Sequence, residues 1–407
     1  MSEVPSECKH VEGRCSVMVA FYGRVNFIRA SVILLTFCFM TGSSPRSVAD
    51  TPIRLRTLPI IRGTLWWIGA KGQPESLSRS WLAAEIQAQV DVGFNLLWIC
   101  NSAQLMQKAK QKSPEQTSFD PLEVIYHLAD EKDLKVIVSL NKGGGHWFGR
   151  IRPETLIAET VRFVREVHER YGHHKSFYGW YLNHEINPIH PSEEAPSAFW
   201  RQVWKGIVTE CHRVAPGSIV TISPFFLLDK ERKRGFKYLT PTEYEQWWSR
   251  TLKETGIDVI MLQDSGEHVA FFTLEDREPF FAAFARACES AGKALWINVE
   301  SAQIEVSDWQ RYLDLEKLGS KEPQAGIMPW KATSMDWLEQ KLRLAARYGT
   351  GIVNWGYYPF MDPNPVSGPY VKSAPQAYEV YKIYYERMIR QFTSDENKDT
   401  KVSNENQ

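Results

Sequence analysis

Eight short apolar stretches alternate with eight amphipathic stretches between Arg62 and Phe392, and this alternation limits the folds that the chain can adopt. The apolar stretches predict buried strands, because parallel strands covered on both faces form nearly continuous hydrophobic runs. The amphipathic stretches predict helices, several of which have proline in the first turn or glycine just after the end. The predicted strands are 62–69, 95–101, 135–142, 177–187, 218–227, 258–264, 294–303 and 351–357. The predicted helices are 78–93, 120–133, 153–172, 195–217, 240–256, 274–292, 334–349 and 374–392.

Eight successive strand–helix units predict a single α/β domain, a (β/α)8 TIM barrel that spans residues 55–392. An open doubly wound sheet is the alternative, but no glycine-rich phosphate-binding turn follows the first predicted strand. No linker divides the barrel. Residues 393–407 are polar and lack apolar periodicity, so we expect them to form a disordered tail.

Residues 1–49 are expected to be a signal peptide rather than part of the fold. The apolar run 31–40 follows two arginines, is about half as long as a membrane span, and precedes the small-x-small pattern at 47–49. The mature chain would begin near Asp50, which N-terminal sequencing would detect, and it would be secreted or periplasmic. A retained signal anchor is the alternative. Once the leader is removed, we expect no stable membrane association.

Charge and cysteine content narrow the choice of partners. The chain has 48 basic and 48 acidic residues, so its composition does not indicate a nucleic-acid partner. Aromatic residues make up 13% of the chain, which suits either a large core or a cleft whose rings stack on sugars. Three cysteines follow the predicted cleavage site, an odd number that implies no disulfide framework. Neither a CxxC nor an HExxH pattern occurs, so no metal site or other cofactor is expected.

Two predicted strands end in glutamate and carry matched neighbours at the same spacing. On each strand an aromatic residue, an amide and the glutamate share one face, because strand side chains alternate. The residues are Tyr181, Asn183 and Glu185 on one strand and Trp296, Asn298 and Glu300 on the other. Active sites of these barrels form at the carboxyl ends of the strands, so the two glutamates would meet at the barrel mouth. This geometry predicts glycoside hydrolysis, in which one carboxyl acts as acid and the other as nucleophile or base.

The remaining strand ends carry amides, aromatics and one carboxylate, a set that suits a neutral polyhydroxylated ligand such as an oligo- or polysaccharide. The candidate substrate-binding residues here are Trp67, Asn101, Asn141, His146, Trp147, Gln263, Asp264, Trp355 and Tyr357, together with Tyr181, Asn183, Trp296 and Asn298 on the two strands that end in glutamate. His146 lies in a glycine-rich loop, where functional residues concentrate. Asp264 could tune the pKa of an acid, bind a sugar hydroxyl, or only cap the following loop.

The glutamates on the fourth and seventh strands resemble those of the large clan of retaining barrel glycosidases. The resemblance implies that Glu185 is the acid/base and Glu300 the nucleophile. In that clan the acid/base glutamate usually follows asparagine directly. Here His184 precedes Glu185, and Asn183 lies two residues back.

The chain also resembles a glycosidase-like barrel family known as domain of unknown function 4434, through six motifs that occur in order along the predicted barrel. They are GTLWWIG at 63–69, GFNLLWI at 93–99, GWYLNHEI at 179–186, IMLQDSG at 260–266, WINVESAQ at 296–303 and IVNWGYYPFMDP at 352–363. The resemblance implies a TIM barrel and a glycosidase-like activity.

Two other functions are open at this point. One is a carbohydrate-binding barrel that has lost catalysis, and the other is a metal-dependent hydrolase built on His146, Glu185 and Asp264. Several residues are expected to be structural only: His173 and His174 before the fourth strand, and the Trp247–Trp248 pair on a helix. The segments 225–237 and 304–333 could close the cleft or contact another subunit. The sugar, the linkage and the oligomeric state are not specified by the sequence.

Overall fold

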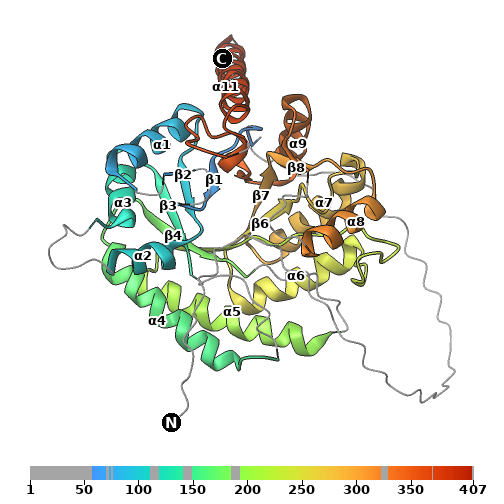
Figure 1. The fold of residues 1–407 in the computed structure, drawn as a ribbon. Coiled ribbons are helices and arrows are strands. Elements are labelled where there is room, and N and C mark those ends of the chain that lie inside the picture. Colours follow the sequence, from blue (N-terminus) through green and yellow to red (C-terminus); the bar gives the residue numbers. More distant parts are fainter. Residues whose placement is uncertain are drawn as a thin grey trace. The chain divides into compact units, whose positions relative to one another are not determined.

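Eight parallel strands form a closed barrel, in the order β1-β10-β7-β6-β5-β4-β3-β2 (Figure 1). The structure, a computed structural model, describes residues 57–69, 73–74, 77–110, 119–140, 149–184, 193–321, 329–368 and 370–405. The barrel strands are β1 (Gly63–Trp66), β2 (Leu96–Ile99), β3 (Lys135–Ser139), β4 (Phe177–Leu182), β5 (Ile219–Ile222), β6 (Val259–Asp264), β7 (Ala294–Glu300) and β10 (Gly351–Trp355). The predicted (β/α)8 barrel is thus confirmed, and each barrel strand lies within a stretch predicted as strand.

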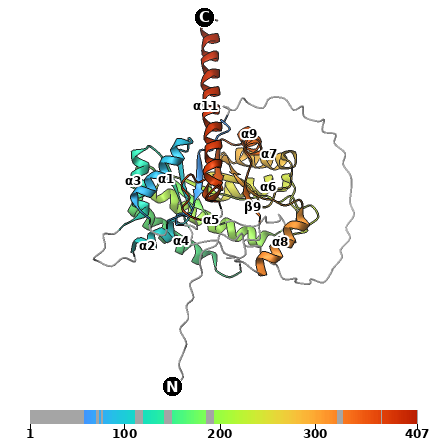
Figure 2. The ribbon, with the colours of Figure 1, turned by 45° about the horizontal axis from the view of Figure 1, so that its top comes forward.

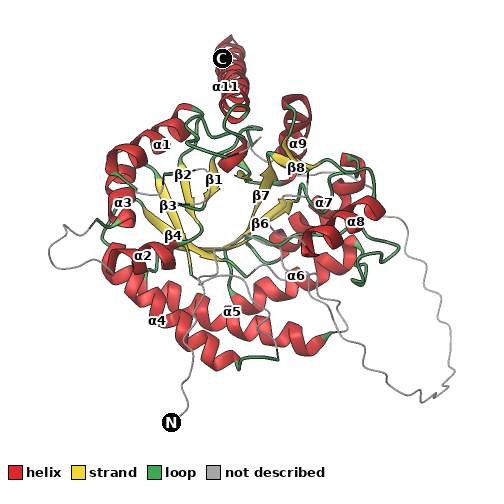
Figure 3. Cartoon of the chain, viewed as in Figure 1, coloured by secondary structure: helices red, strands yellow, loops and turns green. Residues whose placement is uncertain are grey.

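Helices surround the barrel (Figure 3). They are α1 (Arg79–Asp91), α2 (Ser102–Lys110), α3 (Pro121–Glu131), α4 (Pro153–Tyr171), α5 (Glu194–Val214), α6 (Pro241–Thr255), α7 (Leu274–Ser290), α8 (Trp309–Lys321), α9 (Met335–Tyr348), α10 (Tyr357–Phe360) and α11 (Ala374–Glu405). The predicted helix starts are confirmed where the sequence provides a side chain that caps the first N–H groups. Asp120 accepts hydrogen bonds from two N–H groups of α3, and Thr240 and Glu243 form a reciprocal capping box at α6. Among the described residues, no helix combines the length and the apolar character needed to cross a membrane.

Strand side chains divide into two packed layers, because successive residues point to opposite faces of the barrel wall. Outward-pointing strand residues pack against the helices. Trp204 of α5 and the Trp247–Trp248 pair of α6 belong to the same core, which confirms the predicted core role of the pair. Inward-pointing residues fill the barrel, namely Leu96, Trp98, Ile137, Tyr181, Val259, Met261 and Val353. This parity decides which residues at the strand ends face the barrel mouth.

Two segments differ from the prediction. The connection after β7 contains structure of its own, since β8 (Ala302–Ile304) and β9 (Trp330–Ala332) form a two-stranded antiparallel sheet and α8 lies between them in the sequence. The last helix does not end at Phe392 but continues to Glu405 (Figure 2). No glycine or proline follows Pro375, so no helix-terminating residue interrupts the polar extension. The predicted signal peptide, residues 1–49, lies outside the described residues.

A buried carboxyl pair lies between α1 and the segment after α10. Glu85 is fully buried, and it accepts hydrogen bonds from the Tyr358 hydroxyl at 2.8 Å and the Asn364 amide at 3.1 Å. Burial, with the charge of Asp362 as the next cause, raises the pKa of Glu85 to about 7. Burial also raises the pKa of Asp362 to about 6. The two carboxyls therefore retain protons in the folded protein that they release in the unfolded chain.

This pair predicts a loss of stability as the pH rises. Because the folded pKa values lie above the unfolded ones, the stabilisation is complete below about pH 4 and is lost as the pH passes 6 and 7. Glu85→Gln should be more resistant to urea than the wild type at pH 8, by roughly 2 kcal/mol, and should lose this advantage at pH 5. The exposed Glu379→Gln is the control. A Glu85→Gln effect that is the same at both pH values would contradict the prediction.

Candidate functional site

The candidate site lies at the carboxyl ends of β6, β7 and β10, where inward-pointing polar and aromatic residues meet. Gln263 on β6 is the register partner of Asn298 on β7. Glu300 at the end of β7 is the register partner of Trp355 at the end of β10. Since residues two apart on a strand share a face, Asn298 and Glu300 point to the same side. The structure thus brings together four residues that the sequence placed in the site.

Glu300 is the central carboxyl of this group. Its side chain is almost entirely buried, with 6% of the residue exposed, and Oε2 accepts a 2.7 Å hydrogen bond from the backbone N–H of Gly266. Burial raises the pKa of Glu300 well above its ordinary value, while the Gly266 N–H and the charge of Lys341 act in the opposite direction. Glu300 is therefore a desolvated carboxyl that is held in one position by a backbone donor.

Glycine at position 266 is required by the close approach of the loop to strand β8. A Cβ atom there would lie 2.0 Å from the backbone oxygen of Ala302, which is far inside van der Waals contact. The N–H of Ile304 also donates to the Gly266 carbonyl at 2.9 Å. The short β6–α7 loop can thus run alongside β8 and present its N–H group to Glu300.

Asp264 does not face the barrel mouth, so its position does not support the expected contact with substrate. Its neighbour Gln263 points inward, so strand alternation turns Asp264 outward, between β6 and the helices. There Oδ1 pairs with Arg277 at 2.5 Å and Oδ2 with Lys341 at 3.0 Å, and all three side chains are 1–2% exposed. Lys341 also donates to the backbone carbonyl of Glu300 at 2.7 Å. The network holds the end of β7 in place on the outer face of the barrel wall. Because both Asp264 oxygens are used in ion pairs, Asp264 is not available as a ligand for the metal-dependent mechanism.

Asn298, Gln263 and Ser223 form a polar belt on the inner wall beside Glu300. The Asn298 amide donates to the Ser223 hydroxyl at 3.3 Å, and the Gln263 amide donates to the Ser223 carbonyl at 2.7 Å. Asn298 Oδ1 is buried and accepts no hydrogen bond from the described part of the chain. Ser223, which sequence reasoning missed because it lies within an apolar run, positions both amides. The belt therefore offers a buried acceptor next to the carboxyl.

Aromatic rings form the other side of the site. Trp355 lies 5.2 Å from Trp330 and 6.2 Å from Phe360, measured between ring centroids. Tyr370 packs on Phe360 at 4.4 Å, and its hydroxyl donates to the Trp330 carbonyl. Trp330 comes from β9 in the connection after β7, and its position there had no periodic signal in the sequence. The only hint in the sequence was an aromatic residue in a long connection.

A separate apolar cluster secures the segments that flank this side of the barrel. It contains residues from the loop after β5, the loop before α7, and the connection after β7: Phe225, Leu227, Phe271, Phe272, Ile304, Trp309 and Tyr312. Arg234, whose side chain is 1% exposed, stacks over the ring of Tyr312 and pairs with Glu316. A hollow of about 550 Å³ borders the same cluster, and Glu300 is not among its lining residues. Both segments expected to close the cleft are thus packed against each other.

Other predicted site residues lie away from Glu300. Both hydrogen-bonding groups of the Asn101 amide are used by the backbone of Ile68, which joins the ends of β1 and β2. Tyr357 is fully buried outside the barrel, with its ring 5.5 Å from Phe94. Trp296 lies four residues before Glu300 on β7, or about 13 Å lower along the strand. The expected contacts of Asn101, Tyr357 and Trp296 with substrate are therefore not supported by their positions.

Three predicted site residues lie on β4 or just after β1 and β4. Trp67 follows β1, is partly exposed and packs on the inner cluster, whereas Tyr181 is buried lower in the barrel against Trp98, at 4.9 Å. Asn183 follows β4 and is partly exposed. The next residue, His184, is buried against Trp200, and burial lowers its pKa to about 3, so the imidazole is neutral at physiological pH. The predicted Glu185, Asn141, His146 and Trp147 lie outside the described residues.

Comparison with known proteins supports the same architecture. The model of a family described as "Domain of unknown function (DUF4434)" matches residues 75–367. No curated protein matches the sequence.

Many solved structures are similar to this chain, among them the following two. One, from Bacteroides thetaiotaomicron VPI-5482, is provisionally described as an alpha-L-fucosidase, with a TM-score of 0.60 and 18% identity, over 85% of this chain and 99% of that chain. The other is a beta-galactosidase from the psychrophilic Marinomonas ef1, with a TM-score of 0.52 and 11% identity, over 82% of this chain and 60% of that chain. At these identities the likeness concerns the fold alone.

Proposed function

The chain belongs to the DUF4434 family, and we propose that it is a glycoside hydrolase that cleaves an O-glycosidic bond of a neutral glycan with two carboxyl groups. The observation that carries the proposal is the position of Glu300. This glutamate ends β7 at the barrel mouth and accepts a hydrogen bond from the Gly266 N–H. The polar belt and Trp355 flank it. The provisional fucosidase and the beta-galactosidase share the fold, which makes a sugar substrate the first to test.

Glu300 acts as the nucleophile in the proposed reaction. A carboxylate that accepts a backbone hydrogen bond through Oε2 keeps a defined orientation. It attacks the anomeric carbon and forms a glycosyl ester, which water then hydrolyses with retention of configuration. Glu185 is proposed as the acid/base, which protonates the departing oxygen and later activates that water.

The polar belt and the aromatic rings have distinct parts in substrate binding. Asn298 Oδ1, which is buried and accepts no hydrogen bond within the described part of the chain, is proposed to accept one from a sugar hydroxyl. Gln263 is held next to it by the Ser223 carbonyl. The rings of Trp330 and Trp355 offer faces on which the apolar side of a sugar can stack.

Trp330→Ala should raise KM about tenfold and change kcat little, because the ring contacts the bound sugar without taking part in bond cleavage. Tenfold corresponds to roughly 1.4 kcal/mol of binding free energy. Trp330→Phe keeps an aromatic face and is the matched control, with KM within about threefold of the wild type. The measurement is steady-state kinetics on the best glycoside found. An unchanged KM in Trp330→Ala would remove this residue from the site.

A screen of aryl glycosides and of plant and bacterial polysaccharides tests the function itself. We expect hydrolysis of at least one substrate, with the product released first in the substrate's own anomeric configuration, as followed by NMR. Inverted product would contradict the retaining mechanism. Glycans that stabilise the protein thermally without being cleaved would favour a binding barrel that has lost catalysis.

A further inference from the structure

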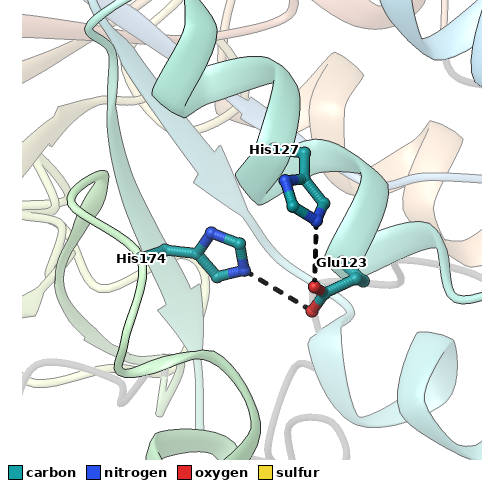
Figure 4. Close-up of side chains that lie close together, drawn as sticks. All are labelled: Glu123, His127 and His174. Atoms are coloured by element: carbon teal, nitrogen blue, oxygen red, sulfur yellow. Dashed lines mark ion pairs between the residues drawn. The ribbon is translucent and has the colours of Figure 1, made fainter.

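A second group of chemically reactive side chains lies outside the barrel, away from Glu300. Glu123 and His127 are one turn apart on α3, and His174 comes from the turn between α4 and β4, three residues before the strand (Figure 4). Figure 4 shows the two imidazole rings directed at the Glu123 carboxylate from different elements. Residues at i and i+4 share a helix face, so α3 alone presents two of the three groups.

The spacing of the three groups suits a metal ion. Glu123 Oε1 lies 3.2 Å from His127 Nε2, and Glu123 Oε2 lies 3.5 Å from His174 Nε2. One ligand atom from each residue can be chosen so that all three lie within 4.8 Å of one another. Tetrahedral zinc has ligands about 2.0–2.2 Å away, which places neighbouring ligand atoms roughly 3.4 Å apart. The observed separations therefore need only small adjustments of the partly exposed Glu123 and the exposed His127 side chains.

His174 is oriented as metal-bound histidines are. The residue is 94% buried, and its Nδ1 lies 2.7 Å from Asp130 Oδ2. Asp130 also accepts a 2.8 Å hydrogen bond from the Ser176 N–H, which fixes the carboxylate. In the neutral tautomer with the proton on Nδ1, facing Asp130, the lone pair is on Nε2. A carboxylate behind a histidine in this way sets the tautomer and orientation of a metal ligand.

His174 Nε2 is also a buried atom without a hydrogen-bond partner among the described residues. The Tyr126 ring stacks on the imidazole at 5.1 Å and prevents it from turning away. The group that it faces is a carboxylate oxygen, which is likewise an acceptor. A cation between these two atoms, 3.5 Å apart, would be attracted by both.

We propose that Glu123, His127 and His174 bind a divalent transition metal ion, with Zn²⁺ as the best fit, at a structural site that ties α3 to the turn before β4. Two imidazoles and one carboxylate match the ligand preference of Zn²⁺, and the exposed side of the cluster leaves the fourth position to water. The site is separate from the proposed catalytic centre and does not depend on the proposed function.

Calorimetric titration of tag-free, chelator-treated full-length protein with ZnCl2 tests the proposal, with MgCl2 as the comparison. We expect one Zn²⁺ per chain with a dissociation constant in the micromolar range or tighter, a higher melting temperature with Zn²⁺, and neither effect with Mg²⁺. Glu123→Gln and His127→Ala, whose side chains are exposed enough to spare the fold, should each weaken binding at least tenfold. Asp130→Asn should weaken it about 10- to 100-fold, because it acts through His174.

His173→Ala is the matched control, since His173 is the exposed neighbour of His174 in the same turn and is outside the ligand set. It should bind Zn²⁺ as the wild type does. Absence of one-to-one Zn²⁺ binding would overturn the proposal. Equal binding by Glu123→Gln, His127→Ala and the wild type would overturn it as well, because the ion would then lie elsewhere.

Discussion

Glu300→Gln is expected to lower turnover by at least about 10³-fold while the protein keeps its fold and its affinity for substrate. Glutamine has nearly the same shape, and its amide oxygen can still accept the hydrogen bond from the Gly266 N–H, so the loop stays in place. It cannot form the glycosyl ester. The measurements are kcat on the best glycoside, circular dichroism, and the melting temperature.

The matched control is Glu305→Gln, in the same connection after β7. Glu305 is 66% exposed and pairs with Lys331 on the surface, so its loss should leave kcat within twofold of the wild type. A Glu300→Gln variant that turns over at the wild-type rate would remove Glu300 from the reaction.

Asp264→Asn is expected to reduce the free energy of unfolding by about 3–5 kcal/mol, the usual cost of removing one partner from a buried ion network. The change leaves Arg277 and Lys341 charged, with side chains about 1% exposed, and without the carboxylate that compensates both. Burial already lowers the pKa of Lys341, and the charge of Asp264 opposes that shift. Urea unfolding at neutral pH measures the loss.

Two further variants distinguish the effect of burial on the free energy of unfolding from the effect of losing a charge. Glu339→Gln, which removes a carboxylate paired with Arg343 and Arg387 at the surface, should cost less than about 1 kcal/mol. Adding Lys341→Met to Asp264→Asn should recover part of the loss, because one uncompensated buried charge is then gone. If Asp264→Asn lowered the free energy of unfolding by less than about 1 kcal/mol, the buried network would contribute no more to stability than a surface ion pair.

The barrel itself was predictable, because each strand is an apolar run long enough to be recognised without neighbours in space. Elements with weaker patterns were missed. The helix Ser102–Lys110 is short, and strands β8 and β9 have three residues each. The polar stretch after Phe392 gave no apolar period, although its residues can extend an existing helix.

The site was predictable where strand alternation alone decides the direction of a side chain. Asn298 and Glu300 follow that rule and share the inner face of β7. Gln263 and Asp264 are consecutive and cannot both point inward, so only one of them could belong to the site. Asn101 and Tyr357 follow the ends of their strands, where turn geometry rather than alternation sets the direction. Trp330 and Ser223 depend on contacts that form only in the folded barrel.

Covalent trapping tests the role of Glu300 most directly. A 2-deoxy-2-fluoro glycosyl fluoride of the accepted sugar forms the glycosyl ester, but the fluorine slows its hydrolysis, so the ester accumulates and survives peptide mapping by mass spectrometry. The expected result is one sugar per chain, attached to the peptide that contains Glu300, with no label on Glu300→Gln. Label on a different residue, or none on a protein that hydrolyses the same sugar, would contradict the proposed mechanism.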